Sequence, residues 1–334
     1  MAIDMHVHWF PDTLVEALRA RRAFPFVDLD ADGRHMLNYP GMRQPIAPGY
    51  TSLARRLDSM QRYGVDIQLL SLGNRMLNAL QCAPAEEALP LCRVFNDGAS
   101  AACRAHPGQF YALAMLPYED IAAAREEFER AMELPGIVGA TLPGGAFLDY
   151  ETASRYRPVL DAAQECGGAH FLAHDCYLYE DYAHLEGRKT DNRIVREDTL
   201  QLQSHLSSIM VTFNMTDLLD DYPDVSVQVH NLGGNTAFEI SRMDHIALFS
   251  KSKGDLPSRR YCRTLVDCNS FAAPAIELAV KLYGADRMMM GTDGTDFGTE
   301  WSLKAVAEAR IAESEKRAIL ADTAASLLGV AAEV

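Results

Sequence analysis

Four histidines and one aspartate have the residue types and positions that metal chemistry requires. His6 and His8 are two residues apart, and residues two apart on a strand point the same way, so both imidazoles can face one point. His174, His230 and Asp293 each stand at the end of a later apolar segment. Three imidazoles with one carboxylate suit zinc or a similar first-row divalent ion. We therefore expect a metal centre built from side chains that are far apart in the sequence.

Each of these histidines would mean little alone, because a polar residue at the end of a strand usually has only a structural role. Four of the ten histidines, however, occupy matching positions, and this coincidence indicates a site. The other six are expected to be structural or solvated: His35, His106, His170, His184, His205 and His245.

Short apolar segments alternate with segments of helical periodicity, and this alternation predicts a parallel sheet. The predicted strands cover residues 2–8, 66–72, 110–116, 138–142, 169–174, 225–230, 264–269 and 288–292. Eight such strands favour closure into a (β/α)8 TIM barrel, with an open doubly wound sheet as the alternative. The five candidate residues would then lie at the carboxyl ends of strands, where the catalytic groups of barrels are found.

Two segments exceed what a minimal barrel needs. Residues 24–50 follow the first strand and predict an inserted loop or subdomain, and residues 176–197 predict a long loop after the fifth strand. Long loops on the active-site face of a barrel commonly carry function. The sequence shows no repeat and no interdomain linker, so we predict one domain over residues 1–334.

Composition narrows the classes of partner. The formal net charge of −15 argues against nucleic-acid binding, which needs a basic surface. No apolar stretch is long enough to predict a membrane span, and the N-terminal residues do not resemble a signal peptide. The seven cysteines form no C-x-x-C pair, which is typical of reduced thiols. We therefore expect a cytoplasmic protein.

Several motifs carry a resemblance to a known family. They are Ile3-Asp4-Met5-His6-Val7-His8, Tyr63-Gly64-Val65-Asp66, His106-Pro107-Gly108-Gln109-Phe110, Tyr222-Pro223-Asp224-Val225 and Met290-Gly291-Thr292-Asp293. Together they resemble the amidohydrolase superfamily, and within it the branch of enzymes similar to aminocarboxymuconate-semialdehyde decarboxylase. The resemblance covers nearly the whole chain.

The resemblance implies a role for each candidate. His6, His8, His174 and Asp293 would bind one metal ion, zinc first and manganese as the alternative, and His230 would be the catalytic acid–base. A single ion is also favoured by the residues themselves. Many two-metal amidohydrolases bridge their ions with a lysine on the fourth strand, whereas the first lysine in this chain is Lys189.

Two arginines are candidates for binding a substrate carboxylate. The resemblance implies that Arg43, in the insert, and Arg242, after the sixth strand, lie near the family's carboxylate-binding positions. Arginine suits this role because its planar guanidinium can bind a carboxylate with two hydrogen bonds. In the family one such arginine comes from the neighbouring subunit, so the resemblance also implies a homodimer.

We expect a metal-dependent, non-oxidative decarboxylase that acts on an aromatic or unsaturated carboxylic acid. The alternative is a hydrolase or hydratase of a related small carboxylate that uses the same metal site. This alternative stays open because the pocket motifs depart from the family, with His174-Asp175-Cys176-Tyr177 in place of the usual His-Pro-Trp-Asp. A non-enzymatic metal-binding protein is disfavoured, because a structural site has no use for a further histidine beside the ligands.

Overall fold

The computed structural model describes residues 1–176, 195–251 and 254–331. In these residues an eight-stranded parallel sheet forms the centre of the molecule, with strands in the order β1-β5-β6-β7-β8-β9-β10-β11. The strands are β1 (Ile3–His8), β5 (Ile67–Ser71), β6 (Phe110–Ala114), β7 (Ile137–Pro143), β8 (Ala169–His174), β9 (Val225–Val229), β10 (Thr264–Asp267) and β11 (Met288–Met289). All eight predicted strands are confirmed.

The two ends of this sheet meet. The backbone N–H of Met5 in β1 donates to the carbonyl of Met290 just after β11, at 2.9 Å, and the N–H of Asp293 donates to the carbonyl of His6 at 2.8 Å. The sheet is therefore a nearly closed (β/α)8 barrel, as predicted, and not an open doubly wound sheet.

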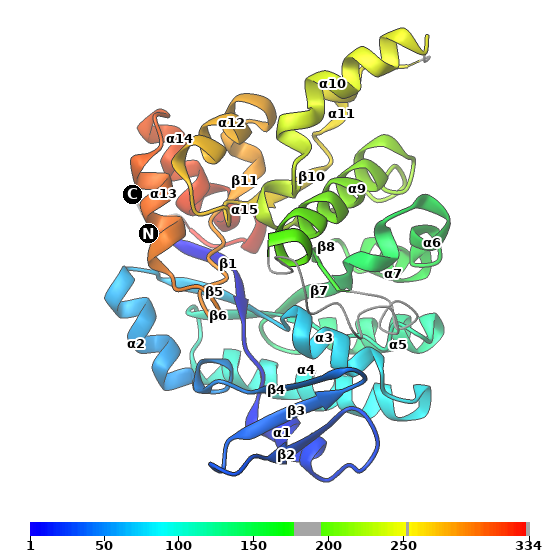
Figure 1. The fold of residues 1–334 in the computed structure, drawn as a ribbon, viewed down its shortest axis with the longest axis vertical. Helices are drawn as coiled ribbons and strands as arrows, with labels where there is room; N and C mark the ends of the chain where they lie inside the picture. Colours follow the sequence, from blue (N-terminus) through cyan, green and yellow to red (C-terminus); the bar gives the residue numbers. More distant parts are fainter. Residues whose placement is uncertain (177–194, 252–253, 332–334) are drawn as a thin grey trace.

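Helices surround the barrel (Figure 1). They are α1 (Asp12–Arg19), α2 (Leu53–Tyr63), α3 (Asn74–Gln81), α4 (Ala85–Ala105), α5 (Ile121–Met132), α6 (Tyr150–Ser154), α7 (Arg157–Glu165), α9 (Leu202–Met215), α10 (Thr236–Phe249), α11 (Pro257–Arg260), α12 (Ala273–Tyr283), α13 (Glu300–Glu308), α14 (Glu313–Arg317) and α15 (Thr323–Leu328). α2 shows how the sequence sets their limits: Ser52 accepts a hydrogen bond from the N–H of Arg55 at its start, and Gly64 ends it in a left-handed conformation.

Strand β1 contains an irregularity that decides where its side chains point. Asp4 pairs with Gln68 and Val7 with Leu70, so three steps along β1 match two along β5 and β1 carries one extra residue. Before this bulge Met5 belongs to the apolar cluster inside the barrel, and after it Val7 packs with the outer core. Because a bulge interrupts the alternation of side chains, His6 and His8 face inward, whereas Asp4 bonds Gln68 and Thr292 outside the barrel.

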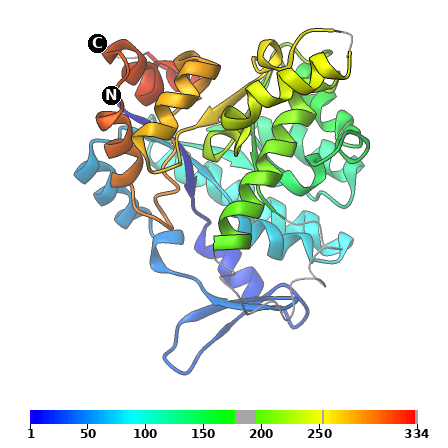
Figure 2. The ribbon, with the colours of Figure 1, turned by 45° about the horizontal axis from the view of Figure 1, so that its top comes forward.

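The insert after the first strand is folded. It contains a three-stranded antiparallel sheet of β2 (Phe26–Leu29), β3 (His35–Tyr39) and β4 (Met42–Pro45), which projects below the barrel in Figure 2. Helix α1 precedes it, so the insert joins α1 to α2. Of the predicted long loop, 176–197, residues 177–194 lie outside the described residues.

Helix α10 extends away from the barrel in Figures 1 and 2. Its exposed apolar side chains include Phe238, Ile246, Leu248 and Phe249. None of the described helices is both long enough and apolar enough to cross a bilayer.

Candidate metal centre

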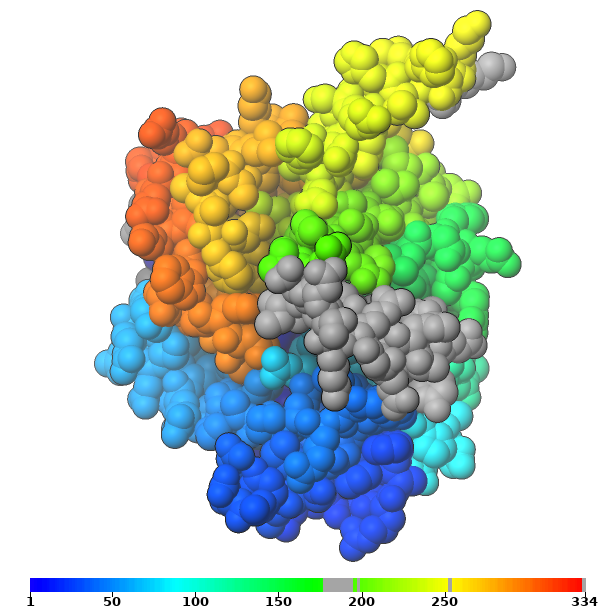
Figure 3. Space-filling model, in the orientation of Figure 1, coloured from blue at the N-terminus to red at the C-terminus, as the bar shows by residue number. Residues whose placement is uncertain are grey.

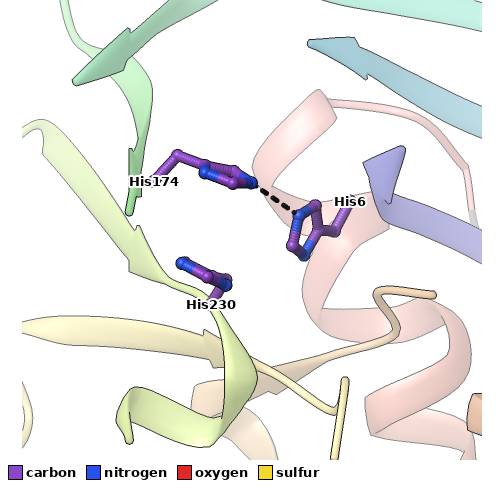
Figure 4. Close-up of side chains that lie close together, drawn as sticks. All are labelled: His6, His174 and His230. Carbon is purple, nitrogen blue, oxygen red and sulfur yellow. Dashed lines mark hydrogen bonds between the residues drawn. The ribbon is translucent and has the colours of Figure 1, made fainter. Parts of the chain in front are cut away.

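The histidines predicted as ligands converge at the carboxyl end of the barrel. His6 and His8 come from β1 and His174 from the end of β8, and all three are buried. The Nε2 atom of His174 lies 3.2 Å from Nε2 of His6 and 3.2 Å from Nε2 of His8 (Figure 4 draws the His6 contact). The Nε2 atom of His8 lies 3.1 Å from Oδ1 of Asp293. The structure thus brings all four predicted ligands together.

The hydrogen bonds of these rings show that a cation fits between them. The Nδ1 atoms of His6, His8 and His174 face oxygen acceptors, namely Asp267 Oδ2 at 3.0 Å, Ser71 Oγ at 3.4 Å and the carbonyl of Asp175 at 3.0 Å. If each Nδ1 carries the proton, each Nε2 presents a lone pair, and the three lone pairs face one another at close range. Tetrahedral ligands with bonds of about 2.05 Å lie about 3.3 Å apart, so the observed separations suit a bound divalent ion.

Charges around the cluster favour a cation as well. Burial lowers the pKa of His6, but Asp267 and other carboxylates outweigh it and raise that pKa to about 9. His8 lacks a partner of that strength, and burial lowers its pKa to about 4. For Asp293 burial raises the pKa, but His8 and the other imidazoles overcome this and hold it well below its usual range. The carboxylate therefore stays ionised and available to a metal.

Asp293 is held in an unusual backbone conformation. Its φ is 47°, in the left-handed region that few non-glycine residues adopt. The hydrogen bond from its N–H to the carbonyl of His6 fixes this conformation and directs the side chain towards His8. Among the described residues Oδ1 of Asp293 is buried and accepts no hydrogen bond, as expected of an atom reserved for a metal.

His230 stands beside the cluster and is held differently. It follows β9, and its ring stacks on that of His174 with centroids 4.5 Å apart (Figure 4). Its Nε2 atom accepts from the N–H of Asp175 at 3.0 Å and lies 3.2 Å from Oδ1 of the same residue. Its Nδ1 atom is buried with no hydrogen-bond partner among the described residues. Burial, followed by repulsion from His174, lowers the pKa of His230, which favours a neutral ring.

Two carboxylates that orient the site were not predicted. Asp267, at the end of β10, accepts from His6 Nδ1, from Gln228 Nε2 at 2.8 Å and from the N–H of Asn231 at 2.9 Å. Asp175 contacts both His174 and His230. Carboxylates in this position fix the tautomer and direction of metal-binding imidazoles. The signal for Asp267 was present, since it is an acidic residue at the end of a predicted strand.

A buried hydrogen-bond chain continues below Asp267. Gln228, which donates to Asp267, accepts from His170 Nε2 at 3.1 Å, and His170 Nδ1 lies 3.0 Å from the hydroxyl of Ser226. Burial lowers the pKa of His170 to about 4. This histidine was expected to be structural, and it lies two hydrogen bonds from the carboxylate that orients His6.

The two predicted substrate arginines lie apart from the cluster. Arg43, in β4, is exposed and pairs with Asp28 at 3.2 Å on the outer face of the insert. Arg242 is exposed on α10, and within the described part of the chain its guanidinium has no ion-pair partner. Neither contacts the histidines within this single chain.

Comparison with known proteins gives the family. The amidohydrolase profile matches residues 3–330, nearly the whole chain. The protein is a member of the amidohydrolase family. This confirms the resemblance drawn from the sequence motifs.

Individual relatives agree with this assignment. Gamma-resorcylate decarboxylase of Rhizobium sp. (strain MTP-10005) is 24% identical over 279 residues, which cover 76% of this chain and 81% of the relative. Among solved structures, the apo form of IDCase from Metarhizium anisopliae aligns with a TM-score of 0.80 at 18% identity, over 98% of this chain and 97% of the other. A dihydroxybenzoic acid decarboxylase from Polaromonas sp. JS666, with bound manganese, aligns with a TM-score of 0.72 at 19% identity. The alignment covers 98% of this chain and 96% of the other.

Proposed function

We propose that this amidohydrolase is a metal-dependent, non-oxidative decarboxylase of an aromatic or unsaturated carboxylic acid. The observation that carries the proposal is the division within the cluster. Donor atoms of four side chains lie next to one another, His6 and His8 each 3.2 Å from His174 and His8 3.1 Å from Asp293, while His230 lies against them with one ring nitrogen held by Asp175 and the other without a partner among the described residues. Such a site needs both a cation and a proton carrier. The relatedness to a gamma-resorcylate decarboxylase supports the choice of reaction.

Each side chain has a task in this reaction. His6, His8, His174 and Asp293 would hold one divalent ion, which when bound supplies Lewis-acid stabilisation of the negative charge that develops on the substrate. The bond between the carboxylate and the substrate carbon breaks, CO₂ leaves, the electron pair stays on that carbon, and His230 passes a proton from water to it. Asp175 holds Nε2 of His230, so that Nδ1 is the atom free to exchange the proton.

A hydrolase or hydratase is the second candidate, and Asp175 favours it. A carboxylate 3.2 Å from His230 Nε2 can accept the proton of the other tautomer, in which Nδ1 presents the lone pair that a base towards water needs. In that reaction His230 would remove a proton from an attacking water molecule. Product analysis separates the two reactions, because only decarboxylation releases one CO₂ for each substrate consumed.

The donor set favours zinc as the ion, since three imidazoles and one carboxylate are usual zinc ligands. The manganese bound in the Polaromonas structure supports manganese as the alternative. We also propose that the working unit is a homodimer, because α10 projects from the barrel with exposed apolar side chains.

The experiment begins with metal analysis of freshly purified protein, followed by chelation and reloading with zinc or manganese. We expect about one equivalent of metal per chain and CO₂ release that returns on reloading. Simple aromatic acids such as 2,6-dihydroxybenzoate are suitable first substrates. Two tightly bound equivalents would contradict the single-ion centre. Water addition without CO₂ release would select the second candidate.

A further inference from the structure

A line of polar side chains runs through the barrel interior below the metal centre. Its members are Ser226, His170 and Gln228, and it ends at Asp267, which accepts from His6. His170 and Gln228 are 2% and 0% exposed, so the line lies inside the molecule and not at the surface that Figure 3 shows, to which the insert (blue) and the chain after β11 (orange) contribute. Bulky aliphatic side chains usually fill a barrel interior, so polar residues at these positions indicate a task beyond packing.

The alternation of the strands explains why these side chains face inward. His170 lies four residues before His174 on β8, and Gln228 lies two residues before His230 at the end of β9, so each points to the same side as the histidine that follows it. Leu172, between the two histidines of β8, belongs to the apolar cluster inside the barrel. The polar groups of the line therefore depend on one another for hydrogen bonds.

Asp267 sets the direction of each hydrogen bond in the line. It accepts from the His6 ring and from the backbone N–H groups of Asn231 and Asn269, as an ionised carboxylate does. Gln228 must therefore turn its NH₂ group to Asp267, where Nε2 lies 2.8 Å from Oδ2.

The direction at His170 follows from that of Gln228. The amide oxygen Oε1 of Gln228 faces His170 Nε2 at 3.1 Å, so this ring nitrogen must carry the proton. The other ring nitrogen, Nδ1, can then accept from the hydroxyl of Ser226 at 3.0 Å. A neutral imidazole satisfies both contacts, and burial keeps the ring neutral by lowering its pKa to about 4.

Gln228 acts on the surroundings of His6 at two points. Besides Asp267, its Nε2 atom donates to the carbonyl of Met5 at 3.4 Å, and Met5 directly precedes His6 in the bulge of β1. An amide with its oxygen and nitrogen exchanged would place an oxygen against Asp267 and repel it. The proton on His170 Nε2 excludes that orientation, because it can pair only with the amide oxygen.

We propose that His170 is a positioning residue for the metal centre: by donating to Gln228 it fixes the amide, and the fixed amide holds Asp267 in the orientation that directs the His6 ring. The inference rests on the proposed function only for the presence of a metal ion, and it applies equally to decarboxylation, hydrolysis and hydration. A histidine with a purely structural role would affect the stability of the barrel and leave metal binding unchanged.

The test measures zinc affinity by competition with a chelator. Q228M, which removes the amide at similar volume, should bind zinc about 10–100-fold more weakly, the usual effect of losing a group that orients a metal-binding imidazole. H170L should lose about tenfold, because the amide remains but its orientation is no longer fixed. H170Q, whose own amide can donate to Gln228 and accept from Ser226, should stay close to the wild type. The visible absorption of the Co²⁺-loaded proteins should change in Q228M and H170L and be retained in H170Q.

The double variant H170L/Q228M tests whether His170 acts through Gln228. Residues that act in one line do not have additive effects, so the double variant should bind zinc as weakly as Q228M alone. Additive losses would show that His170 affects the metal centre by another route and would overturn the proposal.

The matched control is L113A. Leu113 on β6 is fully buried in the same inner apolar cluster but is not a member of the polar line. L113A should lower the temperature of thermal unfolding and keep the zinc affinity of the wild type. Wild-type affinity in H170L, or a loss in H170Q as large as that in H170L, would overturn the role of His170.

The same measurements separate this inference from the proposed reaction, because zinc binding is measured without turnover. A wild type that binds no zinc would overturn the metal centre and this inference with it. A wild type that binds zinc but releases no CO₂ would overturn decarboxylation alone, and the comparison of the variants would still decide the role of His170.

Discussion

At the scale of single residues, each imidazole of the cluster is oriented by the group that its Nδ1 atom contacts. His6 has a carboxylate there, His174 a backbone carbonyl and His8 a hydroxyl. His230 has no such partner at Nδ1 among the described residues. His6, His8 and His174 can therefore present the lone pair of Nε2 to a metal, whereas His230 can gain or lose a proton at Nδ1.

This separation predicts different losses on mutation. His174→Ala should lose metal and activity together, because removing a ligand leaves an incomplete site. His230→Ala should keep most of its metal and lose on the order of 10²–10⁴ in rate, the usual effect of removing a general acid–base. Metal analysis beside steady-state kinetics measures both. A parallel fall of metal content and activity in His230→Ala would show that His230 is a ligand.

Asp267→Asn should weaken metal binding. The variant can still accept from His6 Nδ1 but no longer carries the negative charge that makes the imidazole a better ligand, and such changes cost about 10–100-fold in metal affinity. Competition with a chelator measures the change. Asp4→Asn is the control, because Asp4 is equally buried but contacts the backbone N–H of His6 and not its ring. Equal losses in both variants would mean that burial of charge, not orientation of His6, is responsible.

The sequence was sufficient to predict which residues converge but not what orients them. His6, His8, His174 and Asp293 could be predicted because the ends of parallel strands meet at one rim. Asp175 could not, since it follows a strand in a loop whose direction depends on packing. Asp267 could have been found by asking which strand ends carry acidic residues.

At the scale of elements, the eight barrel strands were predictable because each is a short apolar segment between helical patterns. The sheet of the insert was not, because its strands mix polar and charged residues with apolar ones (FVDL, HMLNY and MRQP) and none is a continuous apolar segment. The bulge in β1 was also missed. It depends on pairing with β5, which periodicity within one strand does not reveal.

Strand β8 makes a pH-dependent contribution to stability through His170. The native pKa of about 4 lies below the ordinary 6.5, so the unfolded chain binds a proton that the native protein does not, and stability is lost as pH falls from 6.5 towards 4. By this linkage the wild type should lose about 2 kcal/mol at pH 5 relative to pH 7 from this residue. His170→Gln, which can still bond Gln228 and Ser226, should lack that part of the loss. Urea unfolding at both pH values measures it, and identical losses in the two proteins would contradict the assignment.

At the scale of the whole molecule, we propose that α10 links assembly to the active site. Arg242 lies on this projecting helix beside exposed side chains such as Phe238, which is 76% exposed, and Phe249, which is 87% exposed. An arginine far from its own metal centre can serve a carboxylate only in a neighbouring chain. A twofold dimer would supply that neighbour and complete two equivalent sites.

Mixing two inactive variants tests this arrangement. His230→Ala and Arg242→Ala should each be inactive alone, and mixing them under conditions of subunit exchange should restore part of the activity, because one site in each mixed dimer has both residues. Light scattering gives the oligomeric state. Exchange without recovery, or a fully active monomer, would show that Arg242 does not act across an interface.

The bulge in β1 has a consequence for how this site can change during evolution. Asp4 and Val7 lie on the same face although three steps separate them along β1, where β5 has two. A deletion of Met5 would remove the extra residue and leave the other side chains of the strand on their present faces, so the two histidines would still point inward. A search for relatives that requires a fixed number of residues before the two histidines would miss proteins that have the site without the bulge.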